Sequence, residues 1–210
     1  NFHQILQTSS GTNWFDEVSR TPISQVYNIS LKGGNRATNY SLNLNYRNLQ
    51  GIMKKSDNRV IFPRLEVNHS MFDGFIRFNA NINGYQQQYF AGTDGGTYNP
   101  QVYRNALTYN PTDRVKDSAG NWTERVEKTD YKNPVALLEE TVGINQNTNL
   151  RTSGTVIIQP VKEVTLNVLA SRDLFNSTRG YYETKKHYST IYGGRNGYAS
   201  RGTTRSTEDL

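Results

Sequence analysis

Residues 38–47 alternate between apolar and small polar side chains with a period of two. One side of this segment carries Tyr40, Leu42, Leu44 and Tyr46, and the other side carries Asn39, Ser41, Asn43 and Asn45. A period of two is that of a β-strand, because successive side chains of a strand point to opposite faces of the sheet. An apolar face with tyrosine at both ends, opposite a small and hydrated face, is typical of a transmembrane barrel strand beside a water-filled lumen.

The same alternation recurs in further segments, which lie at residues 27–32, 64–71, 76–83, 149–158 and 164–171. The sequence therefore predicts an all-β protein with about six antiparallel strands. His69 interrupts the apolar phase of residues 64–71. Because His69 lies close to a predicted turn at Asp73 and Gly74, its strand would be leaving the hydrocarbon there, where a polar outward residue costs only about 0 to 1 kcal/mol.

The predicted connections alternate in length. Short connections are expected at residues 33–37, 73–74 and 159–163, and long ones at residues 48–58 and 84–148. A polar tail is expected from Arg172 to the last residue. Outer-membrane barrels have short periplasmic turns and long extracellular loops. The sequence thus predicts an antiparallel transmembrane β-barrel whose long loops are extracellular.

The composition is poor in apolar residues for a globular core. Hydrophobic residues make up 34% of the 210 residues, and the mean hydropathy is −0.76. The sequence has no run of about 18 apolar residues, so a transmembrane helix is excluded. A barrel remains compatible with this composition, because only every second residue of a barrel strand faces lipid.

The sequence lacks the residues of several kinds of chemistry. It has no cysteine, and its three histidines are far apart, so we expect no metal and no cofactor. The adjacent carboxylates Asp16-Glu17 and Glu139-Glu140 do not resemble a glycosidase pair, whose carboxyls flank the substrate about 5 to 9.5 Å apart, and we expect no enzymatic activity. The net charge of +6 comes from dispersed Lys and Arg residues, which argues against nucleic acid as a partner.

Helices are expected only within the long loops. Asn13 is predicted to cap a helical turn over residues 14–20, and Asn133 with Pro134 is predicted to begin another that runs through residue 140. Residues 117–121 have the composition of a hairpin turn.

The loop at residues 84–148 is rich in aromatic residues among Gly, Asn, Asp and Gln. A loop of this length is usually functional. Aromatic rings beside amides and carboxylates suit sugar rings, which stack through their C–H faces and form hydrogen bonds through their hydroxyls. The candidate ligand-binding residues are therefore Tyr98, Tyr103, Tyr109, Trp122 and Tyr131. The alternative is that these side chains pack the loop against itself.

Several motifs carry a resemblance to a known family. They are Thr-Asn-Trp-Phe-Asp-Glu-Val-Ser-Arg-Thr at 12–21, Tyr-Asn-Ile-Ser-Leu-Lys-Gly-Gly-Asn at 27–35, Leu-Gln-Gly-Ile at 49–52, Asn-Pro-Val-Ala-Leu-Leu-Glu at 133–139 and Gly-Tyr-Ala-Ser-Arg-Gly-Thr-Thr-Arg-Ser-Thr at 197–207. In this order and spacing, the sequence resembles the SusC/RagA family of TonB-dependent outer-membrane transporters of Bacteroidetes-type bacteria. The resemblance spans essentially the whole chain. It departs at Val26-Tyr27, where many relatives carry His-Asn.

The resemblance implies a location, partners and a function. Residues 1–210 would form part of the β-barrel domain of a TonB-dependent receptor, without its plug or TonB-contacting segment, in a barrel of about 22 strands. Such transporters lie in the lipid of the outer membrane of Gram-negative bacteria and import oligosaccharides, or in some members peptides. Their partners are TonB, which pulls on the plug, and a SusD-like surface lipoprotein that closes the barrel as a lid.

Alternating strands also suit a secreted carbohydrate-binding β-sandwich, because such a sheet buries one face in a water-soluble core. The one-sided loop lengths, the tyrosines at strand ends and the Asn-rich second face favour the barrel. If the chain is a section of a barrel, its first and last predicted strands, near residues 27–33 and 164–170, must pair with segments outside the 210 residues.

Overall fold

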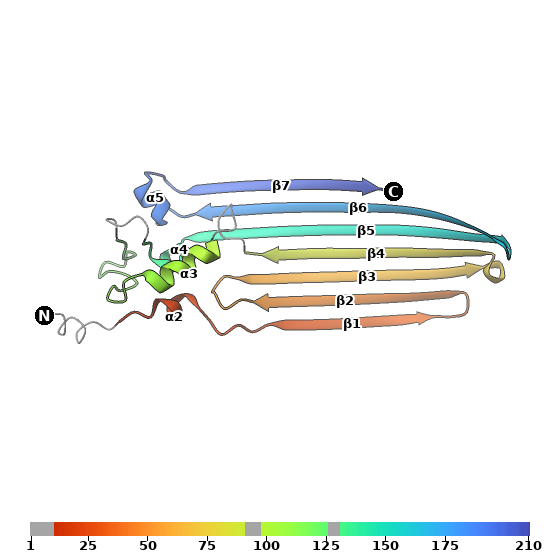
Figure 1. The fold of residues 1–210 in the computed structure, drawn as a ribbon, viewed down its shortest axis with the longest axis horizontal. Coiled ribbons are helices and arrows are strands. Elements are labelled where there is room, and N and C mark those ends of the chain that lie inside the picture. The colour runs from red at the N-terminus through yellow and green to blue at the C-terminus, as the bar shows by residue number, and fades with distance from the viewer. Residues whose placement is uncertain (1–10, 91–97, 126–130) are drawn as a thin grey trace.

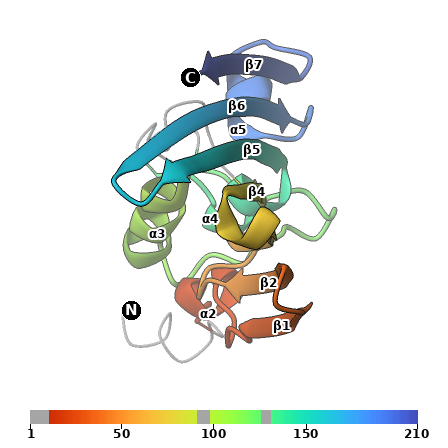
Figure 2. The same ribbon diagram turned by 90° about the vertical axis from the view of Figure 1, so that its right-hand side faces the viewer.

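The computed structural model describes residues 11–90, 98–125 and 131–210, and its strands form one antiparallel sheet. The strand order follows the chain from β1 to β7, so each strand pairs only with its neighbours in sequence. The strands are β1 (Gln25–Gly34), β2 (Thr38–Gln50), β3 (Asp57–Met71), β4 (Ile76–Tyr89), β5 (Thr141–Val161), β6 (Val164–Glu183) and β7 (Tyr198–Asp209). Figure 1 shows the strands side by side, and Figure 2 views them from the end of the sheet.

The six predicted strands are present, but the prediction for the end of the chain was wrong. Instead of a polar tail after Arg172, β6 continues to Glu183 and residues 198–209 form a seventh strand. Most β7 residues are exposed, and main-chain pairing with β6 holds the strand from Tyr198 to Asp209. Because β7 has few apolar residues, the alternation of apolar and polar side chains did not predict this strand. The last strand of the sheet is β7, but its pairing with β6 begins at Arg172, so residues 164–170 keep the open edge that the sequence predicts.

The helices lie in the connections at one end of the sheet (Figure 1). They are α2 (Trp14–Val18), α3 (Tyr98–Thr108), α4 (Pro134–Glu139) and α5 (Tyr188–Tyr192). The two predicted helices are confirmed as α2 and α4, whereas α3 and α5 were not predicted. As expected, the side chains of Asn13 and Asn133 accept hydrogen bonds from the first N–H groups of α2 and α4. No helix in the described parts of the chain is long and apolar enough to cross a membrane.

The two ends of the sheet differ as predicted. At one end the connections are short, and one of them is the 3-10 turn η1 (Phe72–Gly74). Gly74 in that turn has a φ of 95°, a conformation that favours glycine. At the other end lie the longer connections, residues 51–56, 90–140 and 184–197. The longest of these is shorter than the predicted loop at residues 84–148, because β4 extends to Tyr89 and β5 begins at Thr141.

The register gives the sheet one apolar face. Leu42 is paired with Leu31 on one side and with Leu65 on the other. These side chains have no covering layer among the described residues, and Leu31 and Leu42 are 56% and 43% exposed. The β-sandwich alternative requires a second sheet on this face, which the described residues do not form. The apolar face is therefore exposed in the described structure.

The opposite, polar face forms its own hydrogen bonds. The Asn68 amide donates to Asn39 at 3.0 Å, and the Asn79 amide donates to Asn68 at 2.5 Å, so the side chains of three adjacent strands form one row. Ser30 similarly donates to Asn43 at 2.7 Å. Such rows of short polar side chains suit a surface that faces water.

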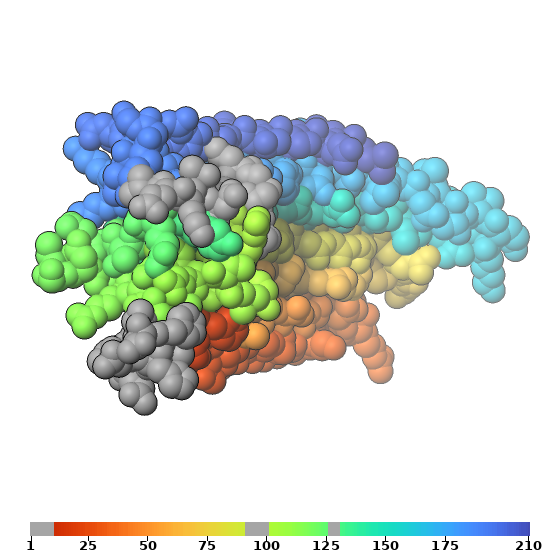
Figure 3. Space-filling model, turned by 60° about the vertical axis from the view of Figure 1, so that its left-hand side comes forward, coloured from red at the N-terminus to blue at the C-terminus, as the bar shows by residue number. Residues whose placement is uncertain are grey.

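The buried core lies outside the sheet. Its members come from α2, α3, α4 and the residue that follows α3, and they are Trp14, Val18, Val102, Ala106, Tyr109, Val135, Leu137 and Leu138. We call the layer formed by residues 11–20, 98–125 and 131–140 the cap. Figure 3 shows the cap beside the segment around α5 at the long-loop end of the sheet. The sheet therefore carries its only compact packing among the described residues at one end.

Candidate functional site

The cap is the candidate functional site, and an aromatic pair holds its centre. The rings of Trp14 and Tyr109 meet edge to face with centroids 4.7 Å apart. The Trp14 indole N–H donates to the carbonyl of Asn110 at 2.9 Å, and the Tyr109 hydroxyl donates to the carbonyl of Thr123 at 2.6 Å. Burial raises the pKa of the Tyr109 hydroxyl, so this group remains a neutral donor. These contacts join α2 to the segment that follows α3.

A hairpin extends from the cap at residues 116–122. The predicted turn at residues 117–121 is confirmed, because the N–H of Asp117 donates to the carbonyl of Asn121 at 2.9 Å. The Trp122 indole donates to a Glu140 carboxylate oxygen at 2.7 Å, and the Lys116 ammonium lies 4.2 Å from the centre of the Trp122 ring. The hairpin is thereby attached to the start of β5.

Asn133 links the hairpin to α4. Its side chain is fully buried and donates to the carbonyls of Val115 and Thr123 at 2.9 and 3.2 Å. The same side chain caps α4, and its main-chain N–H donates to a carboxylate oxygen of Glu124 at 3.0 Å. Because one side-chain amide forms hydrogen bonds with both the hairpin and the helix, Asn133 fixes their relative positions.

Glu124 is the main titratable group of this junction. Burial raises its pKa from 4.5 to about 7, although the hydrogen bond from Asn133 and the charge of Lys132 act in the opposite direction. Its second oxygen is buried without a hydrogen-bond partner among the described residues. The protonated form can therefore be accommodated here more easily than the charged form.

The cap should lose stability as the pH rises. The pKa of Glu124 is higher in the folded state than in the unfolded state, so its contribution is full below about pH 4.5 and is lost as the pH passes about 7. We expect hydrogen-exchange protection factors of the α4 amides to be lower at about pH 8 than at about pH 5. Glu124→Gln should remove this difference. An equal pH response in the Gln variant would assign the effect to another group.

A second buried cluster anchors α5 beside the cap. The Tyr181 hydroxyl donates to one Glu183 oxygen at 2.6 Å, and Ser189 donates to the other. Nδ1 of His187 lies 3.3 Å from that second oxygen. Burial lowers the pKa of His187 despite the nearby carboxylate of Glu183. The cluster fixes the connection between β6 and β7.

The five candidate residues are placed differently. Tyr98 begins α3, but its side chain lies outside the described parts of the structure. Tyr109 is 3% exposed and packs in the cap core, against which the half-buried Trp122 also packs. Tyr103 is 49% exposed with its ring edge to face with Phe15, and Tyr131 is 37% exposed. Tyr109 and Trp122 thus contribute to packing within the cap, whereas Tyr103 and Tyr131 have the more accessible rings.

Sequence reasoning missed an aromatic pair on α5. The rings of Tyr188 and Tyr192 lie 4.8 Å apart, and the Lys132 ammonium lies 5.0 Å from the Tyr188 ring. Tyr192 is 42% exposed. The four-residue spacing of the two tyrosines is a helical signal, but the sequence predicts a polar tail after residue 172. This pair adds aromatic surface next to Lys132.

The carboxylate pairs noted in the sequence have structural partners. Asp16 accepts a hydrogen bond from Asn13 at the start of α2. Glu139 lies 3.5 Å from Lys55, and Glu140 accepts hydrogen bonds from Trp122 and Thr184. No group of three or more potential metal-binding side chains is found in residues 11–90, 98–125 and 131–210.

Comparison with known proteins points to one class of transporter. The chain is 26% identical over 136 residues to the TonB-dependent receptor SusC of Bacteroides thetaiotaomicron, a match that covers 60% of this chain and 13% of SusC. The structure matches the RagAB peptide importer in its closed-closed state with a TM-score of 0.64, and the RagAB peptide transporter with a TM-score of 0.65. Both structural matches have 17% sequence identity and cover 95% of this chain and 23% of the other. No family model matches the chain.

The matches confirm the resemblance to the SusC/RagA family seen in the sequence. They agree with one another, because the sequence match is to SusC and the fold matches are to RagAB. The proteins that match are a receptor and a transporter, and neither is described as an enzyme. The chain spans only 13% of the length of SusC and 23% of the matched RagAB chain.

Proposed function

We propose that the chain forms one section of the wall and the extracellular mouth of a TonB-dependent outer-membrane importer for oligosaccharides or peptides. The observation that carries this proposal is a single antiparallel sheet with an uncovered apolar face and all of its longer connections at one end. The partners would be TonB and a SusD-like surface lipoprotein, as in the resembling family. The membrane would be the outer membrane of a Gram-negative, Bacteroidetes-like bacterium.

The position of the apolar residues on the strands supports a tilted passage through a membrane. Tyr40 on β2 is level with Ala170 on β6 through the register of the intervening strands. On β6 the apolar residues continue from Ala170 to Val164, six residues further toward the short turns. A tilt of about 40° moves a membrane-parallel band by about 4 Å per strand, or about five residues over the four steps from β2 to β6. The oblique band thus has the slope expected of a barrel wall.

The polar ends of the strands follow the same slope. The pairing places one residue of each following strand level with Tyr46. This residue is the apolar Ile61 on β3, and on the next three strands it is polar: Gln86, Thr148 and Asn176. On β6, the ion pair of Arg172 with Asp209 has distances of 2.7 and 2.8 Å. With the slope taken into account, this pair lies at the extracellular edge of the band, where charge is tolerated.

The cap supplies the surface for ligand or lipoprotein contact in this proposal. It carries the accessible rings of Tyr103 and Tyr131, and the aromatic pair of α5 lies beside it. Stacking on such rings suits either a sugar or an aromatic-containing peptide. The residue-level assignment rests on exposure, which favours Tyr103 and Tyr131 over Tyr109.

Deleting the part of the cap that lies between β4 and β5 tests the proposal. In the full-length transporter, replacing residues 91–140 by a short Gly-Ser linker should abolish uptake from a panel of labelled oligosaccharides and oligopeptides, because the mouth loses its contact surface. The amount of barrel in the outer membrane should stay unchanged. Inserting the same linker at residues 162–163, at the short-turn end, provides the control. Unchanged uptake after the deletion would show that the deleted part of the cap has no role in transport.

A further inference from the structure

Arg59 is placed where the apolar face of the sheet ends on β3. It is paired with Asn48 on β2 and with Gln88 on β4, so both of its flanking strands are present in the structure. The residues that follow on the same face of β3 are Ile61, Pro63, Leu65 and Val67. A charged side chain thus stands directly beyond an apolar column, with polar side chains on both sides of it.

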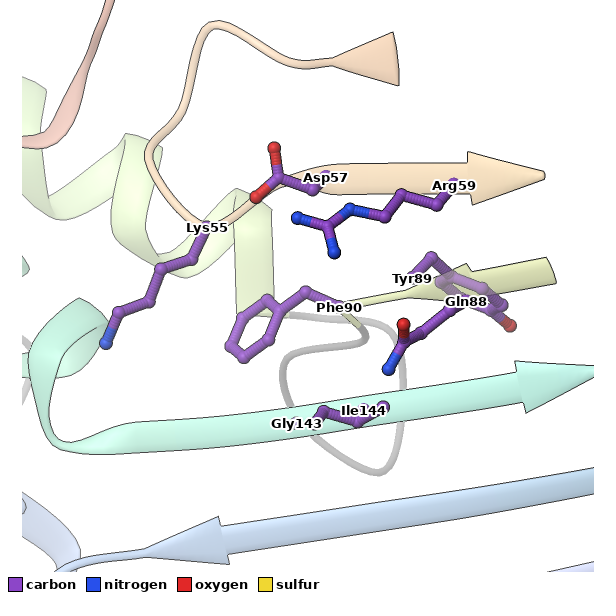
Figure 4. Close-up of a pocket in the computed structure, with 8 residues that line it drawn as sticks. All are labelled: Lys55, Asp57, Arg59, Gln88, Tyr89, Phe90, Gly143 and Ile144. Atoms are coloured by element: carbon purple, nitrogen blue, oxygen red, sulfur yellow. The ribbon is translucent and has the colours of Figure 1, made fainter. Parts of the chain in front are cut away.

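The Arg59 side chain lines a pocket of about 250 Å³. Figure 4 shows its guanidinium lying between β3 and β4 and directed toward the long-loop end. Gln88, Tyr89 and Phe90 form one side of the pocket, and Ile144 on β5 lines it as well. The pocket therefore combines one guanidinium with an amide donor and aromatic or apolar surface.

The other charges of this pocket are already paired. The Lys55 ammonium donates to the carbonyl of Leu138 at 2.7 Å and lies 3.5 Å from a Glu139 oxygen. The Asp57 carboxylate lies 2.8 Å from Arg20. In the described parts of the chain, no carboxylate forms an ion pair with Arg59. The pocket consequently carries uncompensated positive charge and suits an anion.

An aromatic pair marks the level of Arg59 relative to the proposed membrane. Tyr27 and Tyr46 stack with centroids 6.2 Å apart, two register positions nearer the apolar band than Arg59. Tyrosines of this kind lie at the membrane–water interface of barrels. Two residues further along a strand is about 7 Å, or about 5 Å along the membrane normal at a tilt of about 40°, and the step from β2 to β3 adds about 3 Å, so Arg59 stands about 8 Å beyond the tyrosine pair. Arg59 therefore lies at the height of lipid headgroups.

We propose that the Arg59 pocket binds the phosphate headgroup of an anionic lipid in the outer leaflet, with the acyl chains along Ile61, Pro63 and Leu65. This inference rests on the proposed membrane location. Arginine forms bidentate hydrogen bonds with phosphate, and Gln88 offers a further donor. A free phosphate ion would use only the polar groups of Arg59 and Gln88, whereas an amphiphile also uses the apolar column below them, which is why we assign the site to a lipid.

The test uses the purified full-length transporter in a neutral detergent, with diphosphoryl lipid A as the probe. Arg59→Gln should weaken binding of the probe, followed by native mass spectrometry, by about tenfold, because a charge-assisted hydrogen bond is lost. Arg59→Lys should retain part of the affinity. Arg64→Gln is the matched control, since it removes a positive charge from the opposite face of the same strand and should leave binding unchanged.

Two outcomes would overturn the inference. One is equal binding by wild type and Arg59→Gln in preparations that retain the mobility of a folded barrel on electrophoresis. The other is full displacement of the lipid by an equal concentration of inorganic phosphate, which would show a simple anion site. Neither outcome affects the proposed transport function, which fails only if the full-length protein does not reside in the outer membrane or does not take up ligand.

Discussion

Leu44→Arg in the full-length protein is expected to lower the stability of the folded barrel in lipid by about 2 to 4 kcal/mol. Leu44 lies on the apolar face of β2 between Ile29 and Pro63, its partners on β1 and β3. If this face contacts lipid, arginine at Leu44 must place its charge in the hydrocarbon or distort the strand to reach water. The measurement is the folding equilibrium in lipid vesicles as a function of denaturant.

Asn43→Arg is the matched control for this experiment. Asn43 is adjacent in sequence but lies on the polar face, where it accepts a hydrogen bond from Ser30. Arginine at this position should leave the stability nearly unchanged, since the side chain would extend into a water-filled lumen. Equal losses at both positions would contradict the assignment of the two faces, and with it the membrane orientation of the sheet.

The strand pattern was predictable because the register preserves it. A period of two places every second residue on one face, and pairing aligns those faces across the sheet, so the alternation in the six predicted segments already indicated the apolar face of β1 to β6. The caps of α2 and α4 were equally local, since each depends on one Asn and the residues that follow it. Such features need no knowledge of distant contacts.

The remaining elements depend on distant contacts. β7 has almost no apolar alternation, and its place is set by main-chain pairing with β6. Helix α3 was missed because its buried face, which includes Val102 and Ala106, is completed by Trp14 and Leu138 from other parts of the chain. Tyr109 illustrates the same limit within the candidate site. Its aromatic ring suggested ligand contact, and only the tertiary structure shows that it is buried against Trp14.

Both edges of the sheet are open in the described structure, which leads to the last prediction. β1 pairs only with β2, and β7 pairs only with β6. In a membrane, each unpaired main-chain N–H or C=O group costs several kcal/mol, so an open sheet cannot remain in hydrocarbon. Residues 1–210 expressed alone should therefore aggregate in detergent, whereas the full-length protein should be monodisperse.

Hydrogen exchange in the full-length protein provides the complementary measurement. The amides of β1 that do not bond to β2, and those of β7 that do not bond to β6, should be as protected as amides of the central strand β4, because the larger barrel that we propose would supply a neighbouring strand at each edge. Rapid exchange at either edge would show that this edge stays open. A monodisperse, closed seven-stranded barrel formed by the isolated chain would contradict the prediction more directly, since β1 and β7 would then pair with each other and the chain would need no larger barrel around it.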